Sequence, residues 1–248
     1  MKSNCIIQNN LIQYEHFLAK GSKTILFLHG WRSEGSIWHD IAMELQKEKC
    51  NVFTLDLPGF GGSSVPGKVF TVTDYATIVS DFIEKMKIKK VILVGHSFGG
   101  RVALRVTSTN STHIEKLVLV DSAGFVQKEK QLLKRLSKLV KPVFAPSYMQ
   151  GIRKKIYTML GAEDYLATPE LQKTFVNIVG EDLSADMPRI QVPTLLIWGS
   201  QDTDTPLLYG EKMKGLISHS QLIVIPDAGH FSFLDKPKEF YTALMNFV

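Results

Sequence analysis

A serine flanked by glycines is the strongest chemical signal in this chain. Ser97 stands in Gly95-His96-Ser97-Phe98-Gly99, directly after a short apolar run and before a segment with helical character. In this context the G-x-S-x-G pattern predicts a sharp strand-to-helix turn that lifts the serine hydroxyl above a sheet. Positions two before and two after the serine must be small in such a turn, and both are glycine. Ser97 is therefore the candidate nucleophile.

The serine needs a base and an acid, and the chain offers one of each after its last two apolar runs. A serine hydroxyl is a weak nucleophile at neutral pH unless a base lies beside it. His230 follows the last apolar run, so we expect it on a loop at the same end of the sheet as Ser97. An acid must hold the histidine tautomer and stabilise the imidazolium. Asp202 follows the preceding apolar run and is the preferred acid, with Asp204 and Asp121 as alternatives.

Two backbone N–H groups are expected to bind the oxyanion that forms during attack. The N–H of Phe98 opens the helix after the serine, where the helix dipole favours negative charge. The N–H of Trp31 follows an inner apolar run in His29-Gly30-Trp31. One such donor lowers the barrier by about 3 kcal/mol. We expect the His29 side chain to orient this loop, and His96, beside the nucleophile, to be a packing residue.

Strand and helix signals alternate along the chain. Six short apolar runs end at Gly, Pro or Asp, as expected for strands that are covered on both faces. Helix-like segments separate them, with Thr73 as one expected N-cap and Pro237 in the first turn of the last helix. The alternation predicts an α/β fold: a mostly parallel sheet with helices on both faces, plus one or two edge strands from the first 20 residues. The predicted strands are 24–28, 52–56, 90–94, 117–120, 194–198 and 222–225, and the predicted helices are 36–47, 73–86, 97–108, 206–216 and 235–248.

The interval 123–190 breaks this alternation and predicts a helical lid. It carries nine lysines or arginines and one acid between residues 126 and 155. Leucines at helical spacing between these charges favour solvated faces of amphipathic helices over a site for anionic substrates or membranes. The residues we expect to contact substrate, from this interval and from the loops around the serine, are His29, Gly30, Phe125, Phe144, Tyr148 and Phe231.

The overall composition is ordinary for a globular enzyme. The 248 residues are 44% apolar and 21% charged, with a net charge of +5; α/β folds of this size often form one domain. Cys5 and Cys50 lack metal-type spacing and favour free thiols in a reducing compartment. No apolar segment has the length of a signal-peptide core or a membrane span. We expect a soluble cytoplasmic protein with no stable membrane insertion and no nucleic-acid partner.

Together these motifs resemble the α/β-hydrolase superfamily. The resemblance covers nearly the whole chain outside 123–190, and it implies one α/β-hydrolase domain over residues 1–248 with a lid insertion at about 123–190. It also implies an acyl-enzyme mechanism that needs no metal or organic cofactor. Haloalkane dehalogenases and epoxide hydrolases carry an aspartate where this chain has Ser97. The motifs are His29-Gly30-Trp31, Asp56–Ser63, Gly95–Gly100, Pro193–Pro206 and Gly229-His230.

Three functions are compatible with these residues. The preferred one is hydrolysis of a small apolar carboxylic ester. The same three side chains could cleave a carbon–carbon bond of a dicarbonyl acid, whose carboxylate the basic stretch could hold. The third is a ligand receptor built on a slow hydrolase, whose output is movement of the lid. Fold analogy alone does not choose among them, because specificity depends on the lid.

Overall fold

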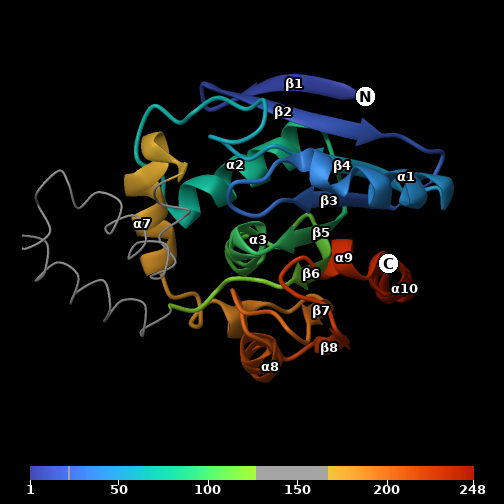
Figure 1. Ribbon diagram of the computed structural model, residues 1–248. Helices are drawn as coiled ribbons and strands as arrows, with labels where there is room; N and C mark the ends of the chain where they lie inside the picture. Colours follow the sequence, from blue (N-terminus) through green and yellow to red (C-terminus); the bar gives the residue numbers. More distant parts are fainter. Residues whose placement is uncertain (22, 127–166) are drawn as a thin grey trace, which may run out of the picture.

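The computed structural model describes residues 1–21, 23–126 and 167–248. In these residues an eight-stranded sheet runs through the centre of the molecule in the order β1-β2-β4-β3-β5-β6-β7-β8 (Figure 1). The pairs β1–β2 and β2–β4 are antiparallel, and every other neighbouring pair is parallel. The strands are β1 (Lys2–Ile7), β2 (Asn10–Phe17), β3 (Thr24–Leu28), β4 (Asn51–Leu55), β5 (Val91–His96), β6 (Ile114–Val120), β7 (Thr194–Gly199) and β8 (Ser220–Ile225).

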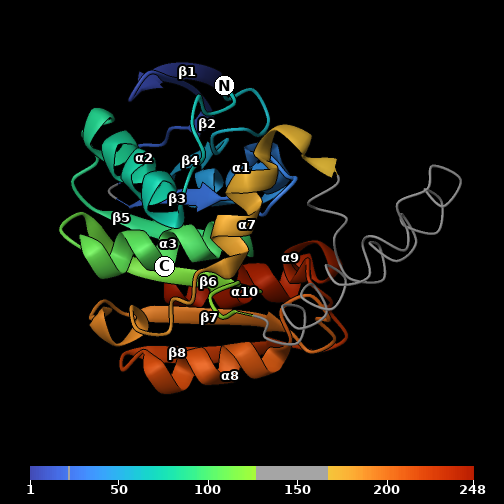
Figure 2. The same ribbon diagram turned by 90° about the vertical axis from the view of Figure 1, so that its left-hand side faces the viewer.

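Helices cover both faces of the sheet. Helices α2, α3 and α8 lie on one face, and α1, α9 and α10 lie on the other (Figure 2). The mostly parallel α/β sheet predicted from the alternating signals is therefore confirmed. The helices in the described ranges are η1 (Gly35–Trp38), α1 (His39–Lys47), α2 (Val72–Lys85), α3 (Phe98–Thr109), η3 (Pro169–Leu171), α7 (Gln172–Gly180), η4 (Met187–Arg189), α8 (Leu207–Leu216), α9 (Ser232–Asp235) and α10 (Pro237–Phe247).

Side-chain alternation along the strands builds a hydrophobic core on each face. In β3, Leu26 and Leu28 point to the layer of α2, α3 and α8, whereas Ile25 and Phe27 point to the layer of α1 and α10. All four side chains are fully buried. Burial on both faces explains why the inner strands have nearly continuous apolar sequences, since neither face can tolerate polar side chains without partners.

The start of helix α2 differs from the prediction, and the predicted last helix, 235–248, is replaced by the two helices α9 and α10. Thr71 and not Thr73 is the N-cap of α2, so its first helical residue is Val72. The Thr71 hydroxyl accepts a hydrogen bond from the Asp74 N–H at 3.2 Å, and the Asp74 carboxylate accepts one from the Thr71 N–H at 2.8 Å. This reciprocal capping box satisfies two N–H groups at the helix start, whereas a cap at Thr73 would leave the box unformed.

Part of the predicted lid lies outside the described residues. These are residues 127–166, which include most of the basic stretch and the expected pocket residues Phe144 and Tyr148. The described end of the interval contains η3, α7 and η4, and it packs on the main domain through the buried side chains of Leu171, Ile178 and Met187. No helix in the described ranges is long and apolar enough to cross a bilayer.

The parallel strands bring the candidate site residues to one edge of the sheet. Strands β3, β5, β6, β7 and β8 run in the same direction, so their carboxyl ends meet at that edge. Ser97 follows β5, Asp202 lies three residues after β7, and His230 lies five residues after β8. Ligand sites of open α/β sheets form at this edge.

Candidate active site

Ser97 occupies a strained turn between β5 and α3. Its φ of 52° and ψ of −112° lie outside the ordinary regions for a residue with a side chain. The neighbouring glycines allow the chain to pack tightly around it. A Cβ atom on Gly95 would lie 2.4 Å from the Gly99 carbonyl oxygen, and one on Gly99 would lie 2.5 Å from the Leu28 carbonyl oxygen. The sequence pattern is therefore required by close backbone approach on both sides of the serine.

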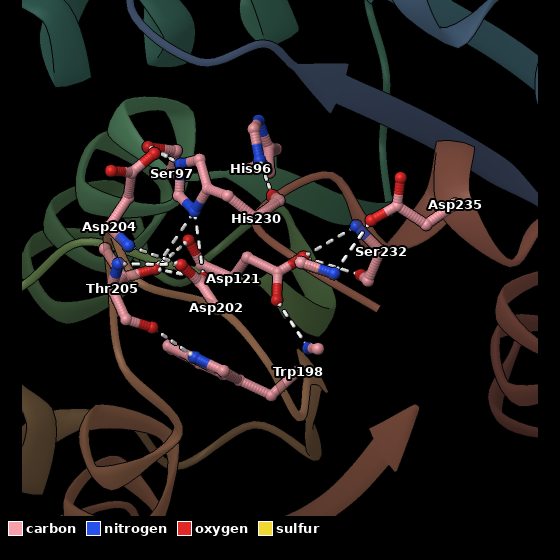
Figure 3. Close-up of polar contacts among 12 residues, drawn as sticks. His96, Ser97, Asp121, Trp198, Asp202, Asp204, Thr205, His230, Ser232 and Asp235 are labelled. Carbon is pink, nitrogen blue, oxygen red and sulfur yellow. Dashed lines mark hydrogen bonds and ion pairs between the residues drawn. The ribbon is translucent and has the colours of Figure 1, made fainter. Parts of the chain in front are cut away.

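Three side chains form one continuous hydrogen-bonded chain at the end of the sheet. His230 Nε2 lies 3.0 Å from Ser97 Oγ, and His230 Nδ1 lies 2.9 Å from Asp202 Oδ2 (Figure 3). The structure thus brings together the predicted nucleophile, base and acid. The distances are those at which a neutral imidazole accepts a hydroxyl proton at one nitrogen while donating to a carboxylate at the other.

The Asp202 carboxylate is held by its own loop. Oδ1 accepts hydrogen bonds from the N–H groups of Asp204 at 2.8 Å and Thr205 at 2.9 Å, and the Thr205 hydroxyl lies 2.8 Å from Oδ2. Burial alone would raise the pKa of Asp202, but the hydrogen bond and charge of His230 lower it below its usual value. Asp202 therefore remains ionised and fixes the orientation of the imidazole.

Asp202 in turn tunes the base. Burial of His230 would lower its pKa, but the hydrogen bond and charge of Asp202 raise the pKa above its ordinary value. The neutral imidazole can accept the serine proton, and the raised pKa means that His230 holds this proton more firmly once it is charged. These are the properties that a general base next to a serine needs.

The two alternative acids do not occupy the position beside His230 Nδ1. The Asp121 carboxylate accepts hydrogen bonds from Gly199 and Ser232. Asp204 is exposed, and its backbone N–H donates to Asp202. The preference for Asp202 therefore agrees with the geometry.

His96 packs behind the catalytic candidate, as expected. Its ring is 1% exposed and lies 4.9 Å, between centroids, from the His230 ring. Its Nε2 lies 2.8 Å from the backbone carbonyl of His230 and donates to it, so Nδ1 is the unprotonated nitrogen. Burial and the proximity of His230 lower the pKa of His96 to about 3, so the ring is neutral and supports the position of residue 230.

His29 corrects one of the expectations for substrate contact. The side chain is fully buried, with Nδ1 2.7 Å from the Gly30 carbonyl oxygen and Nε2 2.9 Å from the Leu57 N–H. Burial lowers its pKa, so the ring is neutral, donating at Nδ1 and accepting at Nε2. It orients the loop after β3, as also expected, but it is not accessible to substrate. Gly30 does lie beside the nucleophile, because a Cβ there would be 3.4 Å from the Ser97 Cβ.

Aromatic side chains gather around Trp31, whose ring packs against Phe98, the residue that follows the serine. Trp31 is partly buried and forms the centre of an aromatic cluster. Its ring centroid lies 4.8 Å from that of Phe60, 5.2 Å from that of Phe98 and 5.2 Å from that of Phe175. Phe60 and Phe175 were missed by sequence reasoning, because nothing in their local patterns links them to residue 31. The Phe98 side chain is itself 4% exposed, so only its backbone N–H remains a candidate for the oxyanion.

Two further predicted pocket residues, Phe231 and Phe125, lie in the described ranges. Phe231 is 40% exposed, and its ring centroid lies 5.4 Å from that of His230. Phe125 is partly buried and packs on Tyr209 with a centroid separation of 5.3 Å. Within residues 1–21, 23–126 and 167–248, no group of three or more His, Cys, Asp or Glu side chains could hold a metal ion.

Thr205 is a site residue that sequence reasoning missed. Its hydroxyl lies 2.8 Å from Asp202 Oδ2, 2.9 Å from the Asp121 carbonyl oxygen and 3.3 Å from His230 Nδ1. The available signal was its place three residues after an aspartate, since Asp side chains commonly accept hydrogen bonds from the backbone of the residues that follow.

Comparison with known proteins identifies the family. The sequence profile of the alpha/beta hydrolase family matches residues 25–243, so this chain belongs to that family and is a hydrolase of that type. It is 26% identical to putative esterase/lipase 2 of Mycoplasma pneumoniae, over 90% of this chain and 88% of that protein. It is 26% identical to 2-hydroxy-6-oxo-6-(2'-aminophenyl)hexa-2,4-dienoic acid hydrolase of Metapseudomonas resinovorans, over 96% of this chain and 88% of that protein. The solved structure of an esterase from Exiguobacterium antarcticum shares the fold, with a TM-score of 0.80 at 24% identity over 100% of this chain and 99% of that one.

Proposed function

We propose that this protein is a serine hydrolase that cleaves carboxylic esters through an acyl-enzyme. The observation that carries the proposal is the unbroken hydrogen-bonded chain from Ser97 Oγ through His230 to Asp202, with links of 3.0 and 2.9 Å. A serine and an imidazole at this distance, with a buried carboxylate behind them, form the arrangement that acyl transfer requires.

The proposed first half-reaction transfers the acyl group to Ser97. The serine oxygen attacks the ester carbon while His230 Nε2 takes the hydroxyl proton, and Asp202 stabilises the imidazolium. We propose that the backbone N–H groups of Trp31 and Phe98 bind the oxyanion. The Phe98 N–H lies in the first turn of α3, where N–H groups lack intrahelical acceptors. His230 then returns its proton to the departing alcohol.

The second half-reaction frees the acyl group by hydrolysis. Water enters the position that the alcohol has left and gives one proton to His230 Nε2 as its oxygen attacks the acyl carbon. The tetrahedral intermediate collapses, the Ser97 oxygen takes the proton back, and a carboxylic acid leaves. No step in this scheme uses a metal or an organic cofactor.

Small apolar esters are the proposed substrates. Phe231 is 40% exposed beside the base, and Trp31 is partly buried, with the buried rings of Phe60, Phe98 and Phe175 packed against it. Aromatic walls of this kind bind apolar groups by burial and shape, with few polar contacts. The name of the similar putative esterase/lipase 2 of Mycoplasma pneumoniae supports an ester as the substrate.

A series of p-nitrophenyl esters tests the proposal. The wild type and Ser97→Ala are mixed with esters of two, four, eight and twelve acyl carbons, and nitrophenolate release is recorded. The proposal expects release that Ser97→Ala abolishes, with a chain-length optimum that sizes the pocket. Absence of release from every ester by well-folded wild type would contradict ester hydrolysis.

Carbon–carbon bond hydrolysis is the second candidate. It is favoured by the similarity to the Metapseudomonas resinovorans hydrolase, whose name describes a dienoic keto acid as substrate. The discriminating assay follows the loss of absorbance of a vinylogous 2-hydroxy-6-oxo-dienoic acid. Turnover of that acid with a higher kcat/KM than that of any p-nitrophenyl ester would replace the ester proposal with this one.

A further inference from the structure

Asp121 is a buried acid that the proposed mechanism does not use. It follows β6, the strand between β5, which leads to Ser97, and β7, which leads to Asp202. Its side chain is 0% exposed, and its φ of 44° is unusual for a residue that is not glycine. A carboxylate is rarely fully buried unless hydrogen bonds or an opposite charge compensate for the loss of water.

The Asp121 carboxylate joins the two segments that carry the acid and the base. Oδ1 accepts a hydrogen bond from the Gly199 N–H at 2.7 Å. Oδ2 accepts two from Ser232, from its N–H at 3.2 Å and from its hydroxyl at 2.6 Å (Figure 3). Gly199 ends β7 and begins the acid loop, residues 200–206, whereas Ser232 begins α9 and ends the histidine loop, residues 226–231. One side chain therefore links both loops at their bases.

The Asp121 backbone adds a third connection to the same site. Its carbonyl oxygen lies 2.9 Å from the Thr205 hydroxyl, which also lies 2.8 Å from Asp202 Oδ2. That hydroxyl has a single proton, so it donates to one of the two oxygens at a time. The residue before Asp121 is tied to the nucleophile, because the Ser97 N–H donates to the Val120 carbonyl at 3.1 Å. Asp121 thus lies where the segments of all three candidate catalytic residues meet.

We propose that Asp121 is a positioning residue, which sets the separation between the acid loop and the histidine loop and adds negative charge behind His230. The inference rests on the proposed function, since it assigns a role within the same site. Asp121 does not touch the reacting atoms, because His230 Nδ1 is hydrogen-bonded to Asp202 and not to Asp121.

The charge of Asp121 gives this role a signature that simple packing would lack. Two ionisable groups interact with the Asp121 carboxylate: the charge of Asp202 raises the pKa of Asp121, and the charge of His230 lowers the pKa of Asp121. Burial is the largest cause and raises the pKa of Asp121 to about 7, whereas the hydrogen bonds from Ser232 and Gly199 lower it, so the carboxylate gains its charge across neutral pH. The groups that interact with the imidazole are Asp202, Asp204 and Asp121, which raise the pKa of His230, and the adjacent His96. Removal of the Asp121 charge should therefore lower the pKa of His230.

Asp121→Asn is the first test variant. The amide has one acceptor oxygen for the donors of Gly199 and Ser232, so one link is lost and the charge is removed. We expect kcat for a p-nitrophenyl ester to fall about tenfold or more while KM changes by less than about threefold. We also expect the acid limb of the pH profile to move to lower pH. Wild-type kcat and an unmoved acid limb in folded Asp121→Asn would overturn the proposal.

Asp56→Asn is the matched control. Asp56 is also a buried carboxylate, and it also joins two loops by accepting N–H hydrogen bonds, from Gly35 at 2.6 Å and from Gly62 at 2.8 Å. It is not among the main influences on the pKa of His230. Asp56→Asn should lower the melting temperature without moving the acid limb. An equal movement of the acid limb in both variants would mean that loosening of any buried loop is sufficient, and would overturn the assignment to Asp121.

An NMR titration separates failure of this inference from failure of the proposed function. The imidazole signal of His230 is assigned with His230→Gln and titrated without substrate in wild type and in Asp121→Asn. The pKa should be lower in Asp121→Asn by about half a unit or more. This result needs no turnover, so it holds even if no ester is a substrate. Equal pKa values of His230 in the two proteins would overturn the inference even in an active esterase.

Ser232→Ala is the replacement variant if Asp121→Asn does not fold. It removes one hydrogen-bond donor to Asp121 and keeps the charge of Asp121. It should lower kcat more than about threefold with unchanged KM, whereas unchanged kcat would overturn the proposal.

Discussion

The substitution Asp202→Asn tests the assignment of the acid most sharply. The Asp202 carboxylate has four hydrogen-bonding neighbours, and an amide of the same shape has only one acceptor oxygen. Two of the neighbours are the N–H groups of Asp204 and Thr205 at Oδ1, which belong to the backbone and cannot rotate away. The amide oxygen should therefore take the Oδ1 position, which leaves the NH₂ group facing His230 Nδ1.

This orientation forces the wrong tautomer on the base. His230 Nδ1 must then accept a hydrogen bond, so the ring proton moves to Nε2, which lies 3.0 Å from Ser97 Oγ. A protonated Nε2 cannot accept the serine proton. For a triad of this geometry such a change lowers kcat by about 10⁴-fold, which corresponds to about 5.5 kcal/mol of barrier. The fold should be retained, because the amide fills the same volume.

The assay is hydrolysis of a p-nitrophenyl ester at pH 7 to 8, with thermal unfolding as the check on folding. Asp204→Asn is the matched control, since it changes an exposed acid two residues away and should keep kcat within about threefold of wild type. Retention of more than a tenth of wild-type kcat in Asp202→Asn, or an equal loss in Asp204→Asn, would refute the tautomer argument.

Three further predictions concern pH dependence and stability. His230 acts as a base only when its imidazole is neutral. Burial lowers the pKa of His230, but the hydrogen bond and charge of Asp202 raise it above 6.5 overall. The value of kcat/KM should therefore rise with pH and reach half its maximum above pH 6.5, and a midpoint below pH 6 would contradict this. Gly95→Ala should lower the free energy of unfolding in urea by about 1–3 kcal/mol, because the new Cβ atom meets backbone atoms. Gly180→Ala is the control, since a Cβ atom there has no atom within 4 Å, and it should change the free energy of unfolding by less than about 1 kcal/mol. Equal effects of the two substitutions would refute the packing argument. Arg101→Ala leaves two partly buried backbone carbonyls, of Glu181 and Phe125, without their guanidinium donor. It should lower the free energy of unfolding by about 1–3 kcal/mol in the same titration, and an unchanged midpoint would contradict this.

Much of the fold could be predicted from local sequence. The inner strands must be apolar on both faces, so they appear as short uninterrupted runs such as 24–28, and their observed boundaries agree with the predicted ones within a few residues. Helix starts were less certain, because a capping box depends on a reciprocal pair. Thr71 and Asp74 form such a pair, whereas Thr73 alone suggested a later start.

The candidate site was predictable where chain order determines position. Ser97, Asp202 and His230 each follow a strand that ends at the same edge of the sheet, so their order along the chain was enough to bring them together. Contacts between distant segments could not be predicted in this way. The two links from Asp121 cross 78 and 111 residues of sequence, and no local pattern specifies them.

Burial also separates side chains that sequence motifs treat alike. His29 and Trp31 belong to one motif, yet the His29 side chain is fully buried between backbone groups whereas Trp31 is partly accessible. A motif gives residue types and spacing, but it does not give the direction of each side chain. For that reason His29 was wrongly included among the substrate contacts, although its expected role in orienting the loop agrees with its hydrogen bonds.

Covalent labelling tests the central claim, that Ser97 is the activated nucleophile, most directly. The wild type is incubated with an alkyl fluorophosphonate, and the intact mass and the modified peptide are determined by mass spectrometry. A fluorophosphonate reacts much faster with a serine whose proton is removed by a neighbouring base than with an ordinary hydroxyl. The account predicts one adduct per chain, located on Ser97, that is absent from Ser97→Ala. No adduct on folded protein, or an adduct on a different residue, would contradict it.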